Sequence, residues 1–178
     1  MSRSKGKQLA IFISYSRSDE AAVKSLAAGL DSARKEIWYD FDIQGGEPWW
    51  DRILESIRTA TLFLFALSDE SLKSKPCMAE VNYAIALNRP ILPVIVGTVD
   101  PSHGPLGDYQ AIVYRPDDAP QAFRVFAAIE ELTEQPRPLP DPLPKPPPIP
   151  FAYLLAIGRK IKNITLAYDE QLAALVTL

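Results

Sequence analysis

The sequence predicts an α/β fold, in which a doubly wound, mostly parallel sheet of five strands is flanked by helices on both faces. Two observations lead to this prediction. Short apolar runs rich in β-branched and aromatic residues alternate with segments of roughly 10 to 15 residues that have helical periodicity. Two of these runs, residues 61–67 and 90–96, are apolar almost throughout, as strands covered on both faces require. Right-handed strand–helix–strand units then build a three-layer sheet.

The expected strands follow one another along the chain at residues 8–14, 36–39, 61–67, 90–96 and 111–114. The first helix is expected over residues 19–34, with Ser18 as its N-cap. A second helix follows Pro48, which suits a first helical turn. Its apolar face is made by Trp50, Ile53, Leu54 and Ile57. A third helix follows a loop within residues 68–88, and the last spans residues 121–134.

The carboxyl ends of parallel strands meet at one edge of the sheet, and ligands bind at that edge in such folds. The loops after the first three strands are residues 14–18, 40–49 and 68–76. We therefore expect a site built from these three loops.

Composition excludes several classes of protein. With 178 residues, 47 % of them apolar and 23 % charged, the chain reads as one globular domain plus an appendage. A net charge of −3 lacks the excess of positive charge that is typical of proteins binding nucleic acid directly. One cysteine and one histidine leave no disulfide within the chain and no ligand set for zinc. The apolar runs are too short to span a bilayer, and no signal-peptide core precedes them, so we expect a cytoplasmic protein without a membrane partner.

Proline marks the domain organisation. Nine of the 17 prolines lie in residues 136–150, a composition that favours extended polyproline II. We interpret residues 135–150 as a semi-rigid linker after a domain at residues 8–134, the alternative being a ligand for aromatic-groove adaptor domains. Residues 151–178 are expected to form a short C-terminal helical segment. It is either the start of a further domain or a hairpin packed on the sheet domain.

Three groups of residues on the predicted loops resemble, in order and spacing, box 1, the BB loop and the serine-to-glutamate signature of the TIR (Toll/interleukin-1 receptor) domain family. These groups are Phe12-Ile13-Ser14-Tyr15-Ser16 with Asp19-Glu20, Trp38-Tyr39-Asp40 with Gly45-Gly46 and Trp49–Ile53, and Ser68 with Ser74–Glu80. The resemblance covers about residues 8–134 and is to bacterial-type TIR domains, in particular the TIR NAD+ hydrolases. It implies a flavodoxin-like fold.

The resemblance implies an enzyme that cleaves the nicotinamide–ribose bond of NAD+, releasing nicotinamide and linear or cyclic ADP-ribose, with NAD+ as substrate and no cofactor or metal. Glu80 matches the glutamate that is catalytic in those enzymes. One carboxylate suffices, because nicotinamide leaves as a neutral molecule and needs no general acid. A negative charge then stabilises the oxocarbenium-like cation. The alternative is that Glu80 is a solvated first-turn acid that interacts with the helix dipole.

The candidate substrate-binding residues lie on the same three loops: Tyr15, Ser16, Arg17, Asp40, Trp49, Ser74 and Cys77. Arg17 either pairs with the pyrophosphate of the substrate or is a solvated surface residue. Asp40 either bonds a ribose hydroxyl or caps its loop. Trp49 flanks the substrate, contacts the next protomer or belongs to the core. Ser74 contacts ribose or, as the favoured alternative, caps the following helix. Cys77 is expected as a small buried residue and not as a nucleophile.

Pro76 stands where the family's enzymes often carry a tryptophan, and it suits the start of a helix with Cys77 and Glu80 in its first turn. This departure favours an alternative, a non-enzymatic TIR adaptor that assembles through BB-loop contacts. For the enzyme, the resemblance implies activation by self-assembly with other TIR protomers, as a homo-oligomer or filament. It also implies a role in bacterial antiphage defence or as a secreted effector, and a C-terminal sensor domain or partner protein.

Overall fold

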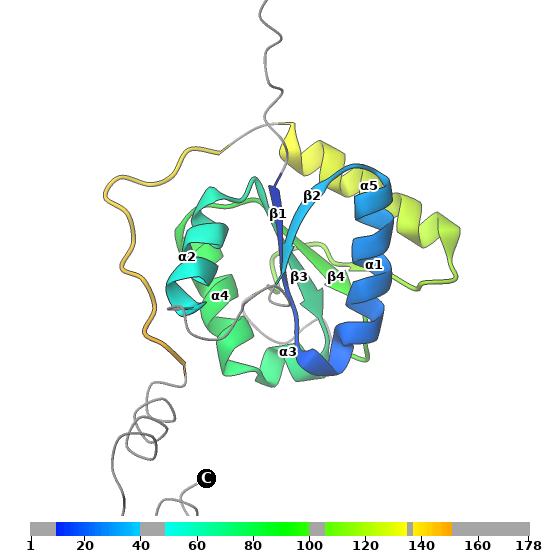
Figure 1. Ribbon diagram of the computed structural model, residues 1–178, viewed down its shortest axis with the longest axis horizontal. Coiled ribbons are helices and arrows are strands. Elements are labelled where there is room, and N and C mark those ends of the chain that lie inside the picture. The colour runs from blue at the N-terminus through cyan, green and yellow to red at the C-terminus, as the bar shows by residue number, and fades with distance from the viewer. Residues whose placement is uncertain (1–9, 40–48, 100–105, 135–136, 151–178) are drawn as a thin grey trace, which may run out of the picture. The chain divides into compact units, whose positions relative to one another are not determined.

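The computed structural model describes residues 10–39, 49–99, 106–134 and 137–150. Within them, five strands form one sheet in which every neighbouring pair is parallel, in the order β2-β1-β3-β4-β5 (Figure 1). The strands are β1 (Ala10–Ser14), β2 (Glu36–Tyr39), β3 (Leu62–Leu67), β4 (Ile91–Ile95) and β5 (Ile112–Val113). The predicted α/β fold is therefore confirmed. The helical segment expected at residues 151–178 lies outside the described residues.

Helices cover both faces of the sheet (Figure 1). One face carries α1 (Glu20–Ser32) and α5 (Ala119–Thr133), and the other carries α2 (Trp49–Thr59) and α4 (Lys75–Ala86). A short helix, α3 (Asp69–Lys73), directly follows β3, and a 3-10 turn at Arg17–Asp19 precedes α1. The sequence predicted neither of these two short elements.

The starts of α1 and α5 differ from the predicted ones. The prediction of Ser18 as its N-cap is wrong, because Ser18 lies inside the 3-10 turn and Asp19 is the residue before α1. The last helix begins at Ala119, two residues earlier than expected, where the Asp118 side chain accepts a hydrogen bond from the backbone N–H of Gln121. Such a cap satisfies one of the donors that the first turn leaves unpaired.

The side chains of β1 point alternately to the two faces of the sheet, so they belong to two separate parts of the core. Ile11 and Ile13 pack with α1 and α5, whereas Phe12 packs with α2 and α4. There Phe12 stacks on Trp38 of β2 and on Phe63 of β3, with ring centroids 4.9 and 5.4 Å apart. All six residues of β3 are buried, which confirms the prediction of a strand covered on both faces. Each large apolar side chain buried in this way contributes about 1.5–3 kcal/mol, so packing on both faces holds the sheet together.

Contacts group the chain into two compact units, residues 1–146 and 147–178. In the first unit, the Arg89 guanidinium donates to the carbonyl oxygens of Ala60, at 3.0 Å, and Arg137, at 3.4 Å. The start of the proline-rich segment is thereby tied to the sheet domain. Residues 137–150 contain neither helix nor strand. Among the described helices, none has the length and apolar character needed to cross a membrane.

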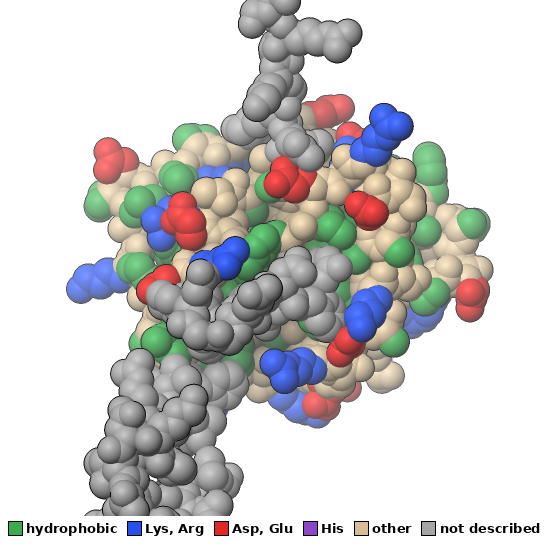
Figure 2. All heavy atoms as spheres, viewed as in Figure 1, with side chains coloured by type: hydrophobic (Ala, Val, Ile, Leu, Met, Phe, Trp, Pro, Cys, Tyr) green, Lys and Arg blue, Asp and Glu red, His purple; other side chains and the backbone are tan. Residues whose placement is uncertain are grey.

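On the face seen in Figure 2, basic and acidic side chains are interspersed among hydrophobic ones, and neither sign forms a broad patch. Most of the ion pairs on the described surface are local pairs within one helix, such as Lys24 with Glu20 and Lys73 with Glu70. Exposed pairs of this kind contribute little to stability. The surface in view thus resembles that of an ordinary globular domain.

Candidate active site

The end of β1 and the second turn of α4 bring a serine and a glutamate together inside the domain. The Ser14 hydroxyl donates a hydrogen bond to Oε2 of Glu80 at 2.6 Å. Ser14 is 1 % exposed and Glu80 is 7 % exposed, so this pair is almost fully removed from water. Ser14 faces α4 because side chains alternate along a strand and Phe12, two residues earlier, packs on the same side.

Glu80 is therefore not the solvated first-turn acid of the alternative interpretation. It is the sixth residue of α4, in the second helical turn and not in the first as expected, and it is buried. A carboxylate in this setting is screened only weakly by solvent, so its charge acts strongly on whatever lies next to it. A buried carboxyl group held by a hydroxyl donor is the kind of group that active sites use.

The start of α4 sets the position of Glu80 on the helix. The Ser74 side chain accepts a hydrogen bond from the backbone N–H of Cys77 at 3.4 Å, which confirms Ser74 as the N-cap. Pro76 is the second residue of α4, where a missing N–H costs no helical hydrogen bond. Pro76 thus helps to start the helix that carries Glu80.

Cys77 lies beside the Ser14–Glu80 pair and is buried, as expected of a small core residue. Burial raises the pKa of its thiol to about 12, and the negative charge of Glu80 raises it as well. Hydrogen bonding with Ser74 and Ser14 lowers the pKa of the thiol, but by less. The thiol is therefore protonated at neutral pH, and Cys77 is not a nucleophile.

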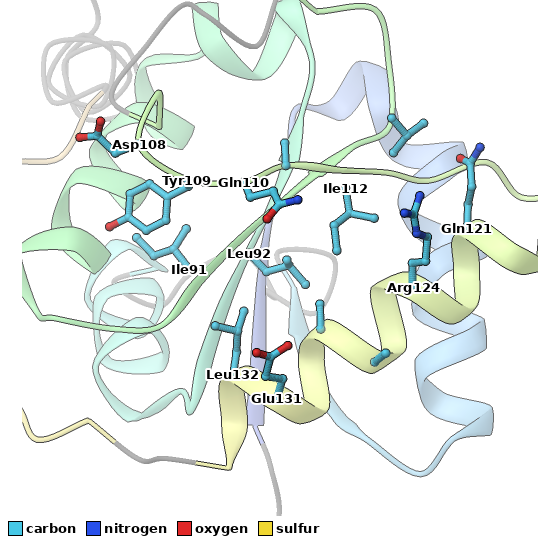
Figure 3. A pocket seen from close by; sticks show the side chains of 14 residues that line it. Ile91, Leu92, Asp108, Tyr109, Gln110, Ile112, Gln121, Arg124, Glu131 and Leu132 are labelled. Atoms are coloured by element: carbon cyan, nitrogen blue, oxygen red, sulfur yellow. The ribbon is translucent and has the colours of Figure 1, made fainter.

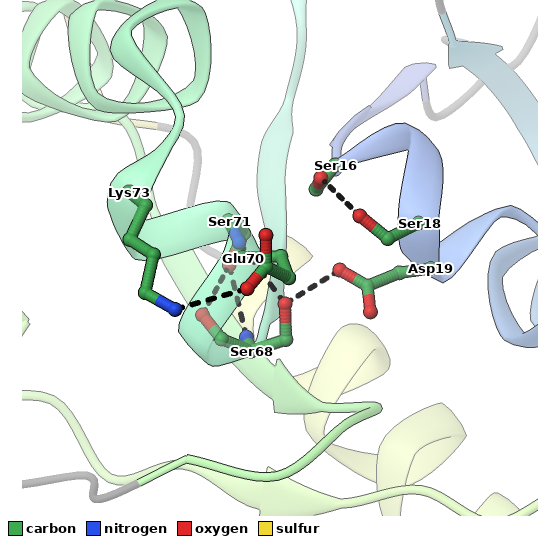
Figure 4. A network of polar contacts seen from close by, with 7 residues as sticks. All are labelled: Ser16, Ser18, Asp19, Ser68, Glu70, Ser71 and Lys73. Carbon is green, nitrogen blue, oxygen red and sulfur yellow. Dashed lines mark hydrogen bonds and ion pairs between the residues drawn. The ribbon is translucent and has the colours of Figure 1, made fainter.

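A second serine–carboxylate pair lies at the same edge of the sheet. The Ser68 hydroxyl, directly after β3, donates to Oδ2 of Asp19 at 2.5 Å (Figure 4). Burial is the main cause that raises the pKa of Asp19, and nearby Glu70 adds to it, while the hydrogen bond from Ser68 lowers it. This pair links the start of α1 to the start of α3.

The other predicted site residues fall in different places. Tyr15 packs with the core on the α1/α5 face, opposite to Ser14 and Glu80. The Ser16 hydroxyl lies 3.0 Å from that of Ser18, and Arg17 is exposed. Asp40 lies outside the described residues.

Trp49 is the first residue of α2, and its side chain also lies outside what the structure describes. Its neighbour Trp50 is 3 % exposed and belongs to the core, as predicted. Ser14 was not among the predicted site residues. A signal was present, because a polar residue ends an otherwise apolar strand at the edge where ligands bind.

A hollow of about 690 Å³ lies elsewhere, between α5, the start of β4 and residues 108–113 (Figure 3). Apolar side chains such as Ile91, Leu92 and Ile112 line it together with polar ones such as Gln110, Gln121 and Arg124. None of the predicted site residues lines it. In the described part of the chain, no group of three or more histidine, cysteine, aspartate or glutamate side chains is arranged to hold a metal ion.

The parallel sheet, with its polar residues at the carboxyl edge, defines a doubly wound α/β domain of the kind that binds ligands at that edge. The family model described as TIR domain matches residues 11–126. The chain therefore belongs to the TIR domain family, as the motifs of the sequence predicted.

Two solved structures with TM-scores above 0.5, both of TIR proteins, share this fold. The TIR domain of the Toll-related receptor TRR-2 from Hydra magnipapillata is 18 % identical, with a TM-score of 0.58, covering 67 % of this chain and 97 % of that one. A metazoan TIR-STING receptor from C. gigas is 18 % identical, with a TM-score of 0.54, covering 86 % of this chain and 45 % of that one. The Clostridium botulinum CMP N-glycosidase BcmB is 14 % identical, with a TM-score of 0.49, covering 66 % of this chain and 98 % of that one. No match was found among curated protein sequences.

Proposed function

We propose that this TIR domain is an NAD+ glycohydrolase, which cleaves the nicotinamide–ribose bond. The observation that carries the proposal is the buried Glu80 carboxyl, whose Oε2 is held at 2.6 Å by the Ser14 hydroxyl. Glu80 is also the residue that matches the catalytic glutamate of the TIR NAD+ hydrolases. Its position and its environment thus support the same role.

The reaction asks little of the protein beyond charge and position. The bond between C1′ of the ribose and the nicotinamide nitrogen breaks, and its electron pair leaves with nicotinamide, which becomes neutral. The ribose carries the positive charge of an oxocarbenium-like cation until water bonds to C1′ and releases a proton. A carboxylate aimed at the ribose lowers the energy of that cation, and it does so more strongly where water is excluded.

Ser14 orients the carboxylate. Its hydrogen bond fixes one oxygen of Glu80, and both residues stand on regular elements, β1 and α4, whose geometry changes little. A catalytic group held in this way needs little reorganisation when charge develops beside it. The protonated Cys77 thiol next to the pair adds no competing negative charge.

We further propose that self-assembly activates the enzyme, with other TIR protomers as partners in a homo-oligomer or filament. Ordering loops around the substrate has an entropic cost, and assembly can offset it. The released ADP-ribose is linear when water bonds to C1′, and cyclic when a nucleophilic atom of the same ADP-ribose bonds to C1′ in place of water. Depletion of NAD+ on assembly fits a role in antiphage defence, and the chain beyond the linker then belongs to a sensor or contacts a partner.

The test uses the full chain at high concentration or with a crowding agent, while light scattering follows assembly. Chromatography then measures NAD+ and nicotinamide for the wild type, for Glu80→Gln and for Glu55→Gln. The last variant is a matched control, because Glu55 is an exposed helical glutamate paired with Arg58. We expect turnover in the wild type and the control but not in Glu80→Gln. Assemblies that form and leave NAD+ intact would contradict the proposal and favour the adaptor.

A further inference from the structure

The loops after three neighbouring strands meet at the Asp19–Ser68 hydrogen bond (Figure 4). The two residues are 49 positions apart, and they join the turn after β1 to the turn after β3. A third segment, after β4, takes part through the backbone, because the N–H of Asp69 donates to the carbonyl of Thr98 at 2.9 Å. We call the Asp19–Ser68 hydrogen bond the edge latch.

Ser68 is held so that its hydroxyl hydrogen points to Asp19. Its Oγ accepts a hydrogen bond from the N–H of Ser71 at 3.0 Å, and its own N–H donates to the Ser71 hydroxyl at 2.9 Å. This reciprocal cap of α3 uses a lone pair of the Ser68 oxygen and leaves its one hydrogen for donation. Asp19 receives that hydrogen.

Gly97 leaves the space in which the latch closes. A Cβ atom at this position would lie 2.9 Å from the Cβ of Ser68 and 3.4 Å from Oδ1 of Asp19. The first distance is shorter than real Cβ contacts allow, so any larger residue must displace Ser68 or the chain around it. The packing itself therefore requires a small residue opposite the latch.

The latch fixes one end of the segment that follows β1. Its other end is Ser14, which is buried and bonded to Glu80. The N–H of Asp19 donates to the carbonyl of Ser16 at 2.8 Å, which closes the turn between them. Residues 15–18 are thus held at both ends, and they carry the exposed Arg17 at the carboxyl edge of the sheet, directly after β1.

We propose that Asp19 is a positioning residue: through Ser68 it holds the turn after β1 so that Arg17 meets the diphosphate of the dinucleotide substrate. This inference rests on the proposed glycohydrolase function. A guanidinium fixed in advance binds an anionic diphosphate with less loss of entropy than one on a free loop.

The unfavourable free energy of ionising Asp19 in the folded chain is consistent with a positioning role. Burial raises its pKa and Glu70 raises it further, so the ionised form is destabilised in the fold. The other charged groups near it are paired on their own helices, Glu70 with Lys73 and Glu20 with Lys24. A destabilised charge that ties two loops together at a ligand edge is typical of a functional site.

The test measures kcat and KM for NAD+ on the assembled full chain. Asp19→Ala removes the acceptor and Gly97→Ala displaces Ser68, and we expect each to raise KM roughly tenfold with kcat little changed. Asp19→Asn keeps an oxygen that accepts from Ser68 and should restore KM to within about twofold of the wild type. Asp118→Ala, which removes the N-cap of α5 and leaves Asp19, Ser68 and Ser71 unchanged, is the structural control and should leave KM unchanged.

A double-mutant cycle asks whether Asp19 acts through Arg17. Arg17→Ala alone should raise KM, and Asp19→Ala should add almost nothing in its presence. Additive effects on KM, or a loss confined to kcat, would overturn the positioning role.

Hydrogen exchange separates failure of the latch from failure of the glycohydrolase. Asp19→Ala and Gly97→Ala should speed exchange of the amides at residues 15–19, whereas Asp19→Asn should not. If the wild type turns over no NAD+, the proposed function is wrong. The exchange rates of the variants then still show whether the latch exists. Unchanged exchange in Asp19→Ala overturns the latch whatever the activity is.

Discussion

The two serine–carboxylate pairs at the carboxyl edge have the same chemistry and different surroundings. Ser14 and Glu80 are both buried, and they join β1 to α4 on the α2/α4 face. Ser68 is buried but Asp19 is only partly so, and they join two turns at the rim. Depth therefore separates the two roles that we assign: a buried carboxylate that stabilises the ribose cation, and a tie between two loops.

The largest expected difference between the two pairs is in the reactivity of a cysteine thiol that lies next to each of them. With a pKa of about 12, roughly one Cys77 thiol in ten thousand is ionised near pH 8, and the greater nucleophilicity of a more basic thiolate offsets part of this, so alkylation should run about a hundredfold slower than for an ordinary cysteine. Iodoacetamide labelling followed by mass spectrometry measures this rate in the folded and the denatured chain.

The matched control places a thiol next to the Asp19–Ser68 pair. Ser18 is exposed and its hydroxyl lies 3.0 Å from that of Ser16, so Ser18→Cys in a Cys77→Ala background puts a cysteine at the rim. It should react at an ordinary rate without denaturant. Rapid labelling of Cys77 in the folded chain would show that the deep pair is open to solvent and would erase the distinction.

Ser14→Ala tests the deep pair itself. It leaves the Glu80 carboxylate without this donor, which we expect to cost about 1–3 kcal/mol in free energy of unfolding and to lower turnover about tenfold to a hundredfold. Urea unfolding and nicotinamide release measure the two effects. Ser14→Thr keeps the hydroxyl and serves as the control. Equal losses in both variants would mean that packing, and not the hydrogen bond, matters at this position.

Ser74→Ala removes the cap of the helix that carries Glu80. We expect the free energy of unfolding to fall by about 1 kcal/mol, the usual value of an N-cap, with turnover lowered only a few-fold. Thermal unfolding followed by circular dichroism measures the change. Ser74→Asp should retain the stability, because aspartate caps helices as well as serine does. A loss in Ser74→Asp as large as that in Ser74→Ala would argue against the cap.

The smallest expected effect is on the pH dependence of stability through Asp19. Because its pKa is raised in the fold, the folded state binds the proton more tightly than the unfolded state. This contribution to stability is present at low pH and is lost as pH rises from the unfolded pKa through the raised folded pKa. Asp19→Asn should therefore be slightly more stable than the wild type near neutral pH, and this advantage should vanish in acid. Thermal unfolding across this pH range measures it, and a variant that is less stable at neutral pH would contradict the sign.

The fold could be predicted from the sequence because its signals are local. The apolar run of β3 and the bounds of β2 at Glu36–Tyr39 are visible in short windows of the chain. The short α3 could not be predicted, because its five residues contain a single large apolar side chain and show no periodicity. Ser18 was misplaced as a cap because a 3-10 turn intervenes before α1.

The candidate site could be predicted only in part. The matching motif selected Glu80, and the capping rule selected Ser74, which the structure confirms as the N-cap. The partners of the two carboxylates are 66 and 49 residues away in the chain, so no local pattern pairs Ser14 with Glu80 or Ser68 with Asp19. Only the pairing of strands in the folded sheet brings these residues together.

The most direct test of the central claim is the rate of nicotinamide release by assembled wild type compared with assembled Glu80→Gln at equal light scattering. We predict nicotinamide and ADP-ribose in equal amounts from the wild type, and a rate in Glu80→Gln lower by about a thousandfold or more. Glutamine keeps an oxygen that accepts from Ser14, so the variant should fold and assemble normally. Equal rates in the two assemblies, or no release from either, would contradict the assignment of Glu80 as the catalytic carboxylate.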